Sequence, residues 1–290
     1  MGEFSGKTAF ISGASRGIGL AIAVRLATEG AAVAFIAKTA EPHPALPGTV
    51  YTAAAEIEAA GGRALAIVGD IRSDEQVQTA VERTVSEFGG VDIVVNNASA
   101  IDLSPTEHLP MKRYDLMQDV NTRGTFLVSK ACIPHLRAAR KAGRDAHILT
   151  LSPPLDLRPR WFGANLGYAI AKYGMSMCTL GLAAELADEG IAANSLWPRT
   201  IIATAAVQNL LGGDEAMARA RRPEILADAA YEILRRPSTE CTGNFFIDDE
   251  VLAEAGITDL SAYSYGHESG LQGDIFLGGW LGGGVVSVPG

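Results

Sequence analysis

Short apolar runs alternate along this chain with longer segments that have a helical pattern of apolar positions. The short runs are rich in β-branched residues and predict strands at Thr8–Ile11, Ala32–Ile36, Ala64–Val68, Asp92–Val95, His147–Leu151, Ile191–Leu196 and Asn244–Ile247. The longer segments predict helices near residues 17–29, 49–60, 73–88, 107–138, 165–187 and 222–235. Strands that alternate with helices form βαβ units, so we expect the strands to lie parallel in one sheet.

The expected fold is a Rossmann-type, doubly wound α/β sheet of about seven parallel strands in a single domain. We expect residues 1–250 to form this domain and residues 251–290 to form a C-terminal extension. Glu41–Gly48 holds three prolines directly after the second predicted strand, which predicts an ordered loop insertion. Six of the last thirteen residues are glycine, which predicts weak order there unless a partner surface holds Trp280 and Leu281.

Composition narrows the classes of partner. The chain has 290 residues, of which 48% are hydrophobic, so it can bury a sizeable core. Its net charge is −9, which gives no indication of a basic face and argues against nucleic acid or an anionic membrane as the main partner. The three cysteines are widely spaced and the histidines share no ligand spacing, so neither disulfides nor a metal site is expected. Neither a signal peptide nor an apolar run long enough for stable membrane insertion is visible, which predicts a cytoplasmic protein.

A glycine-rich turn follows the first predicted strand directly. It reads Ser12-Gly13-Ala14-Ser15-Arg16-Gly17-Ile18-Gly19 and leads into a helical segment. Its three glycines allow a tight turn and let a pyrophosphate approach the backbone at the start of the helix. An ordinary strand-to-helix loop is the alternative, but the place of this turn at the first junction favours a dinucleotide site.

Residues at the ends of the next strands indicate which cofactor binds. An NAD site usually has a carboxylate at the end of the second strand, but here Ala37 stands there and Lys38 follows. Together with Arg16 in the glycine turn, Lys38 favours NADP(H), because two cations can pair with a 2′-phosphate. A solvated Lys38 without a ligand is the alternative. Asp70, followed by Ile71, ends the third strand, where its carboxylate can accept a hydrogen bond from the adenine amine.

Two further clusters lie at later strand ends. Asn96-Asn97-Ala98-Ser99 ends the fourth strand and is expected to pack beside the glycine turn. Ser152 follows the fifth strand, and Tyr168 and Lys172 are four residues apart at the start of a long helix. Residues at this spacing share one helix face, so both can point into one cleft. A nearby ammonium lowers the pKa of a tyrosine, which is about 10 in isolation, and Ser152 could hydrogen-bond the substrate oxygen.

The chain resembles the short-chain dehydrogenase/reductase family over roughly residues 5–250. The resemblance rests on an ordered set of residues: Gly13, Gly17, Gly19, Asn96-Asn97-Ala98, Asn121, Ser152, Tyr168 and Lys172. The segments ILTLSPPLDLRPRWF, YAIAKYGMSM, NSLWPRT, TAAVQNLLGG and TGNFFIDDEVLAEAGI look like the hydroxysteroid-dehydrogenase-like branch of that family. Animal members of this branch carry an additional sterol-carrier domain at the C-terminus, which we do not expect in this chain. The resemblance implies that residues 1–250 bind NADP(H).

The resemblance also implies roles for the matching positions. Tyr168 would be the acid/base, Lys172 would modulate the Tyr168 pKa and reach the nicotinamide ribose, and Ser152 would orient the substrate. Asn121 would form a backbone kink that holds a water in a proton relay. Pro198 and Thr200 would border the nicotinamide. The chain departs from the family pattern in three places: Ser99 and Arg199 replace glycines, and Ser152 lies 16 residues before Tyr168, slightly more than the common spacing.

The sequence therefore predicts an NADP(H)-dependent oxidoreductase that interconverts a carbonyl and a secondary alcohol. Several apolar residues near the expected cleft suggest an apolar or acyl-type small-molecule substrate: Leu155, Leu157, Trp161, Phe162 and Trp197. The helices at 107–138 and 165–187 resemble those that build family dimers and tetramers, so a homodimer or homotetramer is expected. The alternative is a non-catalytic module that senses NADP(H) or binds lipid. The intact Ser/Tyr/Lys set argues against it, because a binder does not need an acid and an orienting group.

Overall fold

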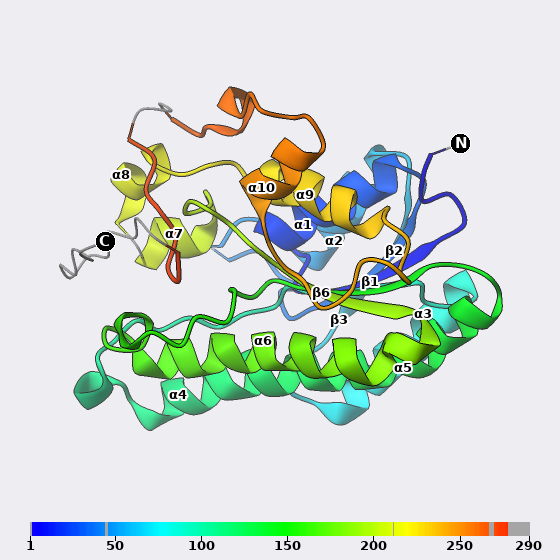
Figure 1. The fold of residues 1–290 in the computed structure, drawn as a ribbon, viewed down its shortest axis with the longest axis horizontal. Helices are drawn as coiled ribbons and strands as arrows, with labels where there is room; N and C mark the ends of the chain where they lie inside the picture. The colour runs from blue at the N-terminus through cyan, green and yellow to red at the C-terminus, as the bar shows by residue number, and fades with distance from the viewer. Residues whose placement is uncertain (1, 44–45, 211, 267–269, 278–290) are drawn as a thin grey trace.

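Seven parallel strands form the centre of the structure, with helices on both faces of the sheet (Figure 1). This computed structural model describes residues 2–43, 46–210, 212–266 and 270–277. The strands are β1 (Thr8–Ser12), β2 (Ala32–Ala37), β3 (Arg63–Val68), β4 (Ile93–Asn96), β5 (Ala146–Thr150), β6 (Ile191–Trp197) and β7 (Phe245–Ile247). Their order across the sheet is β3-β2-β1-β4-β5-β6-β7, and all neighbouring strands are parallel. The predicted doubly wound sheet is confirmed. Its topological switch point lies between β1 and β4, where ligands of such sheets bind.

The helices form two layers. One face of the sheet is covered by α1 (Gly17–Thr28), α2 (Val50–Ala59), α9 (Glu224–Leu234) and α10 (Asp248–Glu254). The other face is covered by α3 (Asp74–Phe88), α5 (Gly124–Lys141) and α6 (Leu166–Leu186). Shorter helices are α4 (Met111–Met117), α7 (Ala205–Leu210) and α8 (Gly213–Ala218). Each layer buries its own cluster of apolar side chains against the sheet.

The apolar strands are explained by this double cover. Side chains along a strand alternate between the two faces. In β1, Ala9 and Ile11 pack in the core under α1, whereas Phe10 packs in the core on the opposite face. All three are fully buried, so a continuous apolar run is the pattern that a central parallel strand requires.

The helix expected over residues 107–138 is interrupted. The structure has α4, then a π-helical turn at Gln118–Arg123, and then α5. Buried Asn121 lies in this turn, where its side-chain Oδ1 accepts from Ala100 N at 2.7 Å and its Nδ2 donates to Ala100 O at 3.0 Å. A π-turn commonly marks a functional position in a helix. The apolar pattern did not reveal this break because it continues through both helices.

The chain after β6 holds more structure than the sequence predicted. The helices α7, α8 and α10 were not foreseen, and the expected domain limit at residue 250 falls inside α10. Val251 and Leu252 of α10 are fully buried in the same core as α1 and α9. Pro44 and Ala45 of the expected loop insertion, and the tail with Trp280 and Leu281, lie outside the described residues. Among the helices that are described, none is long and apolar enough to cross a membrane.

Candidate active site

The glycine turn and the end of β4 lie side by side. Ser12 Oγ accepts hydrogen bonds from Asn97 N at 3.1 Å and Ala98 N at 3.2 Å. In the other direction, the Asn97 side chain donates hydrogen bonds to Ser12 O at 3.1 Å and to Gly13 O at 2.9 Å. A Cβ added to Gly19 would stand 2.4 Å from Asn97 Nδ2. The glycines therefore let two loops meet at the start of α1, and this close backbone cradle fits a bound pyrophosphate.

Gly13 is needed for two separate reasons, and a matched pair of variants separates them. Its φ of +75° is left-handed, and an added Cβ would meet Ala98 Cα at 2.9 Å. Gly89, at the end of α3, has a similar φ of +87° but open space around it. Because Asn tolerates left-handed φ, we expect Gly89→Asn to lower the free energy of unfolding by less than about 1 kcal/mol. Gly13→Asn should lower it by about 1–3 kcal/mol more. Urea unfolding measures both, and equal losses would contradict the close approach of Ala98.

Tyr168 and Lys172 face one cavity beyond the carboxyl ends of the strands. The cavity has a volume of about 180 Å³. Six residues predicted for the catalytic and cofactor sites line it: Ile18, Asn97, Ser99, Tyr168, Lys172 and Pro198. Lys172 is buried, and its Nζ donates to Leu151 O at 2.9 Å and lies 5.0 Å from the centroid of the Trp197 ring. The fold thus brings the four-residue Tyr/Lys spacing and the glycine turn to one place.

Burial controls the charge state of this pair. It raises the pKa of Tyr168 well above its usual value, and the neighbouring Asp274 raises it further. Burial also lowers the pKa of Lys172 to about 7, an effect that Asp274 partly opposes. At neutral pH the phenol therefore holds its proton, which is the state required to donate a proton to a carbonyl oxygen.

Ser152 does not line this cavity. Its hydroxyl is fully buried and lies 2.7 Å from Ser195 Oγ of β6. Ser152 lies two residues after the end of β5, and this contact directs its hydroxyl to the neighbouring strand β6. The substrate-orienting role expected for Ser152 has no geometric support in this structure.

The residues expected to hold the adenosine end lie at the same edge of the sheet. Lys38 is 62% exposed, and its Nζ lies 3.6 Å from the Asp70 carboxylate. Arg72 binds that carboxylate through several hydrogen bonds and, with Lys38, lowers the Asp70 pKa to about 2. Arg16 donates to Pro47 O at 2.8 Å and Gly48 O at 2.9 Å. Asp70 is therefore already engaged by Arg72, whereas the Lys38 ammonium is open to solvent.

The other predicted cofactor residues differ in position. Ser15 and Ile71 are buried, Ala98 packs against the core, and Gly17 begins α1 with a φ of +58°. Thr200 is buried beside the cavity-lining Pro198, and its Oγ1 has no hydrogen-bond partner within the described part of the chain. An unpartnered buried hydroxyl is uncommon, but Thr200 is not among the residues that line the cavity, so its expected place beside the nicotinamide stays a prediction.

An aromatic cluster stands behind the cavity. Phe276 lies between the rings of Trp161, Tyr168, Tyr173 and Trp197, at centroid distances of 5.3–6.5 Å. Leu155 and Phe162 pack against the same cluster. Leu157 is 70% exposed and is not among the residues that line the cavity. Four of the five apolar residues expected at the cleft are thus in this cluster, and Trp197 also lines the cavity.

Sequence reasoning missed two acids at this site. Asp274 lines the cavity, and Asp248 is fully buried below it, where it accepts from Arg199 N and Asp249 N, each at 2.8 Å. Asp248 stands in a run of three acidic residues, a pattern that by itself indicates a solvated turn. Asp274 stands in a glycine-rich stretch without periodicity, so only contacts between distant segments could reveal it.

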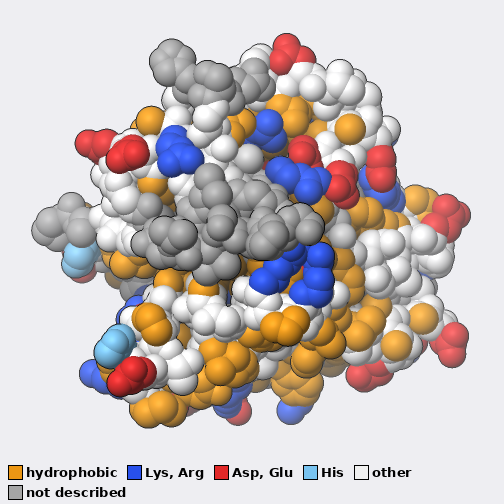
Figure 2. Space-filling view, turned by 60° about the vertical axis from the view of Figure 1, so that its left-hand side comes forward, with side chains coloured by type: hydrophobic (Ala, Val, Ile, Leu, Met, Phe, Trp, Pro, Cys, Tyr) orange, Lys and Arg blue, Asp and Glu red, His pale blue; other side chains and the backbone are white. Residues whose placement is uncertain are grey.

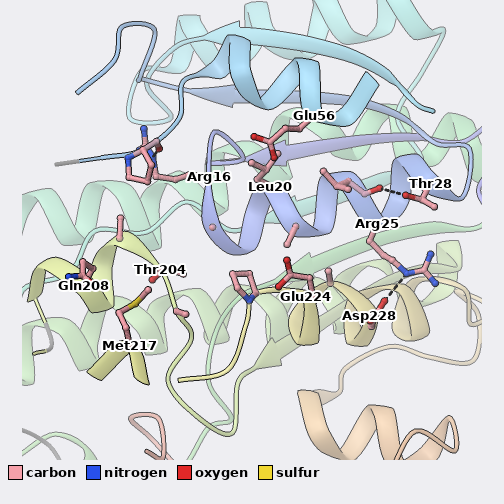
Figure 3. A pocket seen from close by; sticks show the side chains of 18 of the residues that line it. Arg16, Leu20, Arg25, Thr28, Glu56, Thr204, Gln208, Met217, Glu224 and Asp228 are labelled. Carbon is pink, nitrogen blue, oxygen red and sulfur yellow. Dashed lines mark hydrogen bonds and ion pairs between the residues drawn. The ribbon is translucent and has the colours of Figure 1, made fainter. Parts of the chain in front are cut away.

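A larger groove of about 570 Å³ lies between α1 and α9 (Figure 3). Thr204 lines both this groove and the smaller cavity. The groove does not contain Tyr168 or Lys172, and its Arg25 is paired with Asp228 at 2.7 Å. The chemistry is therefore assigned to the smaller cavity.

A doubly wound sheet with a glycine turn before its first helix is the architecture of dinucleotide-binding oxidoreductases. The sequence comparison narrows this class: the short chain dehydrogenase profile matches residues 7–213, and the chain belongs to that family. It is 55% identical over 276 residues to hydroxysteroid dehydrogenase-like protein 2 of Xenopus tropicalis. That match covers 95% of this chain but 64% of the relative, so the chain spans less than two thirds of the relative's length.

Solved structures agree with this assignment. A short chain dehydrogenase from Mycobacterium thermoresistibile is 60% identical, with a TM-score of 0.88 over 94% of this chain and 96% of that one. Carveol dehydrogenase from Mycobacterium avium, solved in complex with NAD, is 25% identical, with a TM-score of 0.73 over 85% of this chain and 97% of that one. The family uses nicotinamide cofactors.

Proposed function

We propose that this chain is an NADP(H)-dependent oxidoreductase that interconverts a carbonyl and a secondary alcohol on an apolar or acyl-type small molecule. The observation that carries the proposal is the pairing of Tyr168 with Lys172 in one cavity beside the glycine turn. A bound NADP(H) would supply or accept the hydride.

Residues of the protein supply the proton for the carbonyl oxygen and stabilise the phenolate that remains. Tyr168 donates its phenolic proton to the carbonyl oxygen during reduction, because burial keeps this phenol protonated at neutral pH. Lys172, held by Leu151 O, stabilises the phenolate that remains and would also bind the nicotinamide ribose. Trp197 and Ile202 give the cavity an apolar wall that excludes water and suits an uncharged substrate.

Two cations support NADP(H) over NAD(H). Lys38, directly after β2, and Arg16, in the glycine turn, would pair with the 2′-phosphate, and Ala37 at the end of β2 has no carboxylate to bind a ribose 2′-hydroxyl. The glycine cradle fits the pyrophosphate of such a cofactor.

The test is the oxidation of NADPH, monitored by the loss of NADPH absorbance. The carbonyl substrates are benzil, which is an aromatic diketone, and a set of medium-chain ketones. Turnover that depends on the carbonyl is the expected result. Tight NADPH binding without turnover of any of these carbonyls would overturn the proposal in favour of a non-catalytic, NADP(H)-sensing protein.

Cytoplasmic localisation belongs to the same proposal, because the three cysteines are unpaired, as suits a reducing compartment.

A homo-oligomer is part of the proposal as well. Figure 2 shows hydrophobic side chains along the lower part of the molecule, where α4, α5 and α6 lie. On α6, Ile170, Met177 (57% exposed) and Leu180 (52% exposed) share one helix face, and Phe126 of α5 is also exposed. Exposed apolar stripes of this kind mark subunit contacts.

Charging this stripe should separate the subunits. We expect the double variant Met177→Glu, Leu180→Arg to weaken assembly at least about a hundredfold, because two side chains worth about 1.5–3 kcal/mol each leave the contact. Sedimentation equilibrium measures the change. Leu157→Arg, which charges a leucine that is more exposed and lies outside α6, serves as the control. A wild-type monomer, or an unchanged oligomer in the double variant, would contradict this interface.

A further inference from the structure

The segment Gly270–Leu277 is fixed against the active site by main-chain hydrogen bonds. Ile201 N donates to Gln272 O at 2.9 Å, and Asp274 N donates to Arg199 O at 3.0 Å, so the segment pairs antiparallel with the chain that follows β6. Trp197 Nε1 also donates to Ile275 O at 2.8 Å. Phe276 anchors the end of the segment in the aromatic cluster. Asp274 is therefore held on a rigid support.

Asp274 contributes the only carboxyl group among the described residues that line the Tyr168 cavity. One of its oxygens, Oδ1, accepts from Ile275 N at 2.6 Å. Neither Tyr168 nor Lys172 forms a direct ion pair or hydrogen bond with this carboxyl within the described structure, because the Lys172 ammonium donates to Leu151 O instead. Asp274 lines the cavity, so this residue borders the space where a substrate would lie.

The charge around Asp274 favours a neutral acid. Burial raises the Asp274 pKa to about 8, and the carboxylate of Asp248 adds to this rise. The Ile275 N–H and the Lys172 ammonium act in the opposite direction but do not cancel it. A protonated carboxylic acid has one O–H donor, which a carboxylate lacks.

A carbonyl oxygen gains negative charge as it is reduced, and a second donor beside the tyrosine stabilises that charge. Ser152 was expected to provide this donor, but its hydroxyl is directed at Ser195 in the sheet. We propose that Asp274 takes this place: its protonated carboxyl donates the second hydrogen bond, beside that of Tyr168, to the oxygen of an uncharged ketone or aldehyde. The inference rests on the proposed reductase function. The proton that is transferred comes from Tyr168, and Asp274 keeps its own.

Three variants test this role with NADPH and benzil. Asp274→Ala removes the donor, and we expect kcat to fall about 100- to 1000-fold, as for the loss of one oxyanion donor. Asp274→Asn keeps an N–H donor that does not ionise. It should retain activity within about tenfold of the wild type and lose the decline that the wild type shows as pH rises through about 8. Asp259→Asn alters an exposed acid outside the cavity and is the control.

A readout without turnover accompanies the kinetics. Infrared difference spectra of the protein without cofactor, wild type minus Asp274→Asn, should show a protonated-carboxyl band that disappears as pH is raised through about 8. A carboxyl that is already ionised below about pH 6 would overturn the proposal. So would an Asp274→Ala enzyme within about threefold of the wild type while activity still requires Tyr168. Activity that survives Tyr168→Phe overturns the reductase function instead, and a lack of carbonyl turnover overturns both.

Discussion

Replacing Tyr168 with Phe should lower kcat/KM for NADPH-dependent reduction of benzil about 1000-fold, within the range for loss of a general acid. This corresponds to about 4 kcal/mol of transition-state stabilisation. The reason is that the phenol, which lines the cavity and stays protonated at neutral pH, is the group proposed to transfer its proton to the carbonyl oxygen, whereas Asp274 only donates a hydrogen bond. Affinity for NADPH, measured by fluorescence titration, should change little, because the variant removes one hydroxyl and keeps the ring.

Tyr173 offers a matched control on the same helix. Its hydroxyl donates to Asp156 O at 2.6 Å, so it holds the loop before α6 and does not line the cavity. We expect Tyr173→Phe to cost about 1 kcal/mol of stability and to leave kcat/KM within a few-fold of the wild type. Equal losses of activity in the two variants would mean that packing of α6, and not proton transfer, explains the effect of Tyr168→Phe.

Replacing Lys38 with Ala should lower affinity for NADPH about 10- to 100-fold and leave affinity for NADH nearly unchanged. A charge-assisted contact with a phosphate is worth about 1.5–3 kcal/mol, and NADH has no phosphate on the 2′-oxygen. Arg16→Ala should act in the same direction. It will also loosen the loop that Arg16 holds through Pro47 O and Gly48 O, so Lys38→Ala is the cleaner test.

Arg63 provides the control for net charge. It is an exposed cation at the start of β3, the end of the strand away from the cofactor edge, and it pairs with Glu87 at 3.2 Å. Arg63→Ala should leave the NADPH titration unchanged. Higher salt should weaken NADPH binding in the wild type more than in Lys38→Ala, because salt screens the exposed ammonium. Equal wild-type affinity for NADPH and NADH would contradict the assignment of these cations.

Most of the fold could be predicted from local sequence patterns. All seven strands form within one or two residues of the predicted limits, because central parallel strands must be apolar on both faces. The break at Asn121 could not be predicted this way. It depends on a hydrogen-bond pair with Ala100, which comes from another part of the chain.

In the candidate site, too, some features follow from local sequence and others from contacts between distant segments. The sequence by itself determined the parallel sheet, the glycine turn and the Tyr168–Lys172 pair, because each depends on residues that are close together along the chain. Only the tertiary structure decided the direction of Ser152 and the position of Asp274. The Ser152 hydroxyl is directed to Ser195 of the neighbouring strand β6, a contact between residues 43 positions apart, while Leu151 lines the cavity. Asp274 reaches the cavity because its segment pairs with the chain after β6, and such pairing between distant segments leaves no periodic pattern in the sequence.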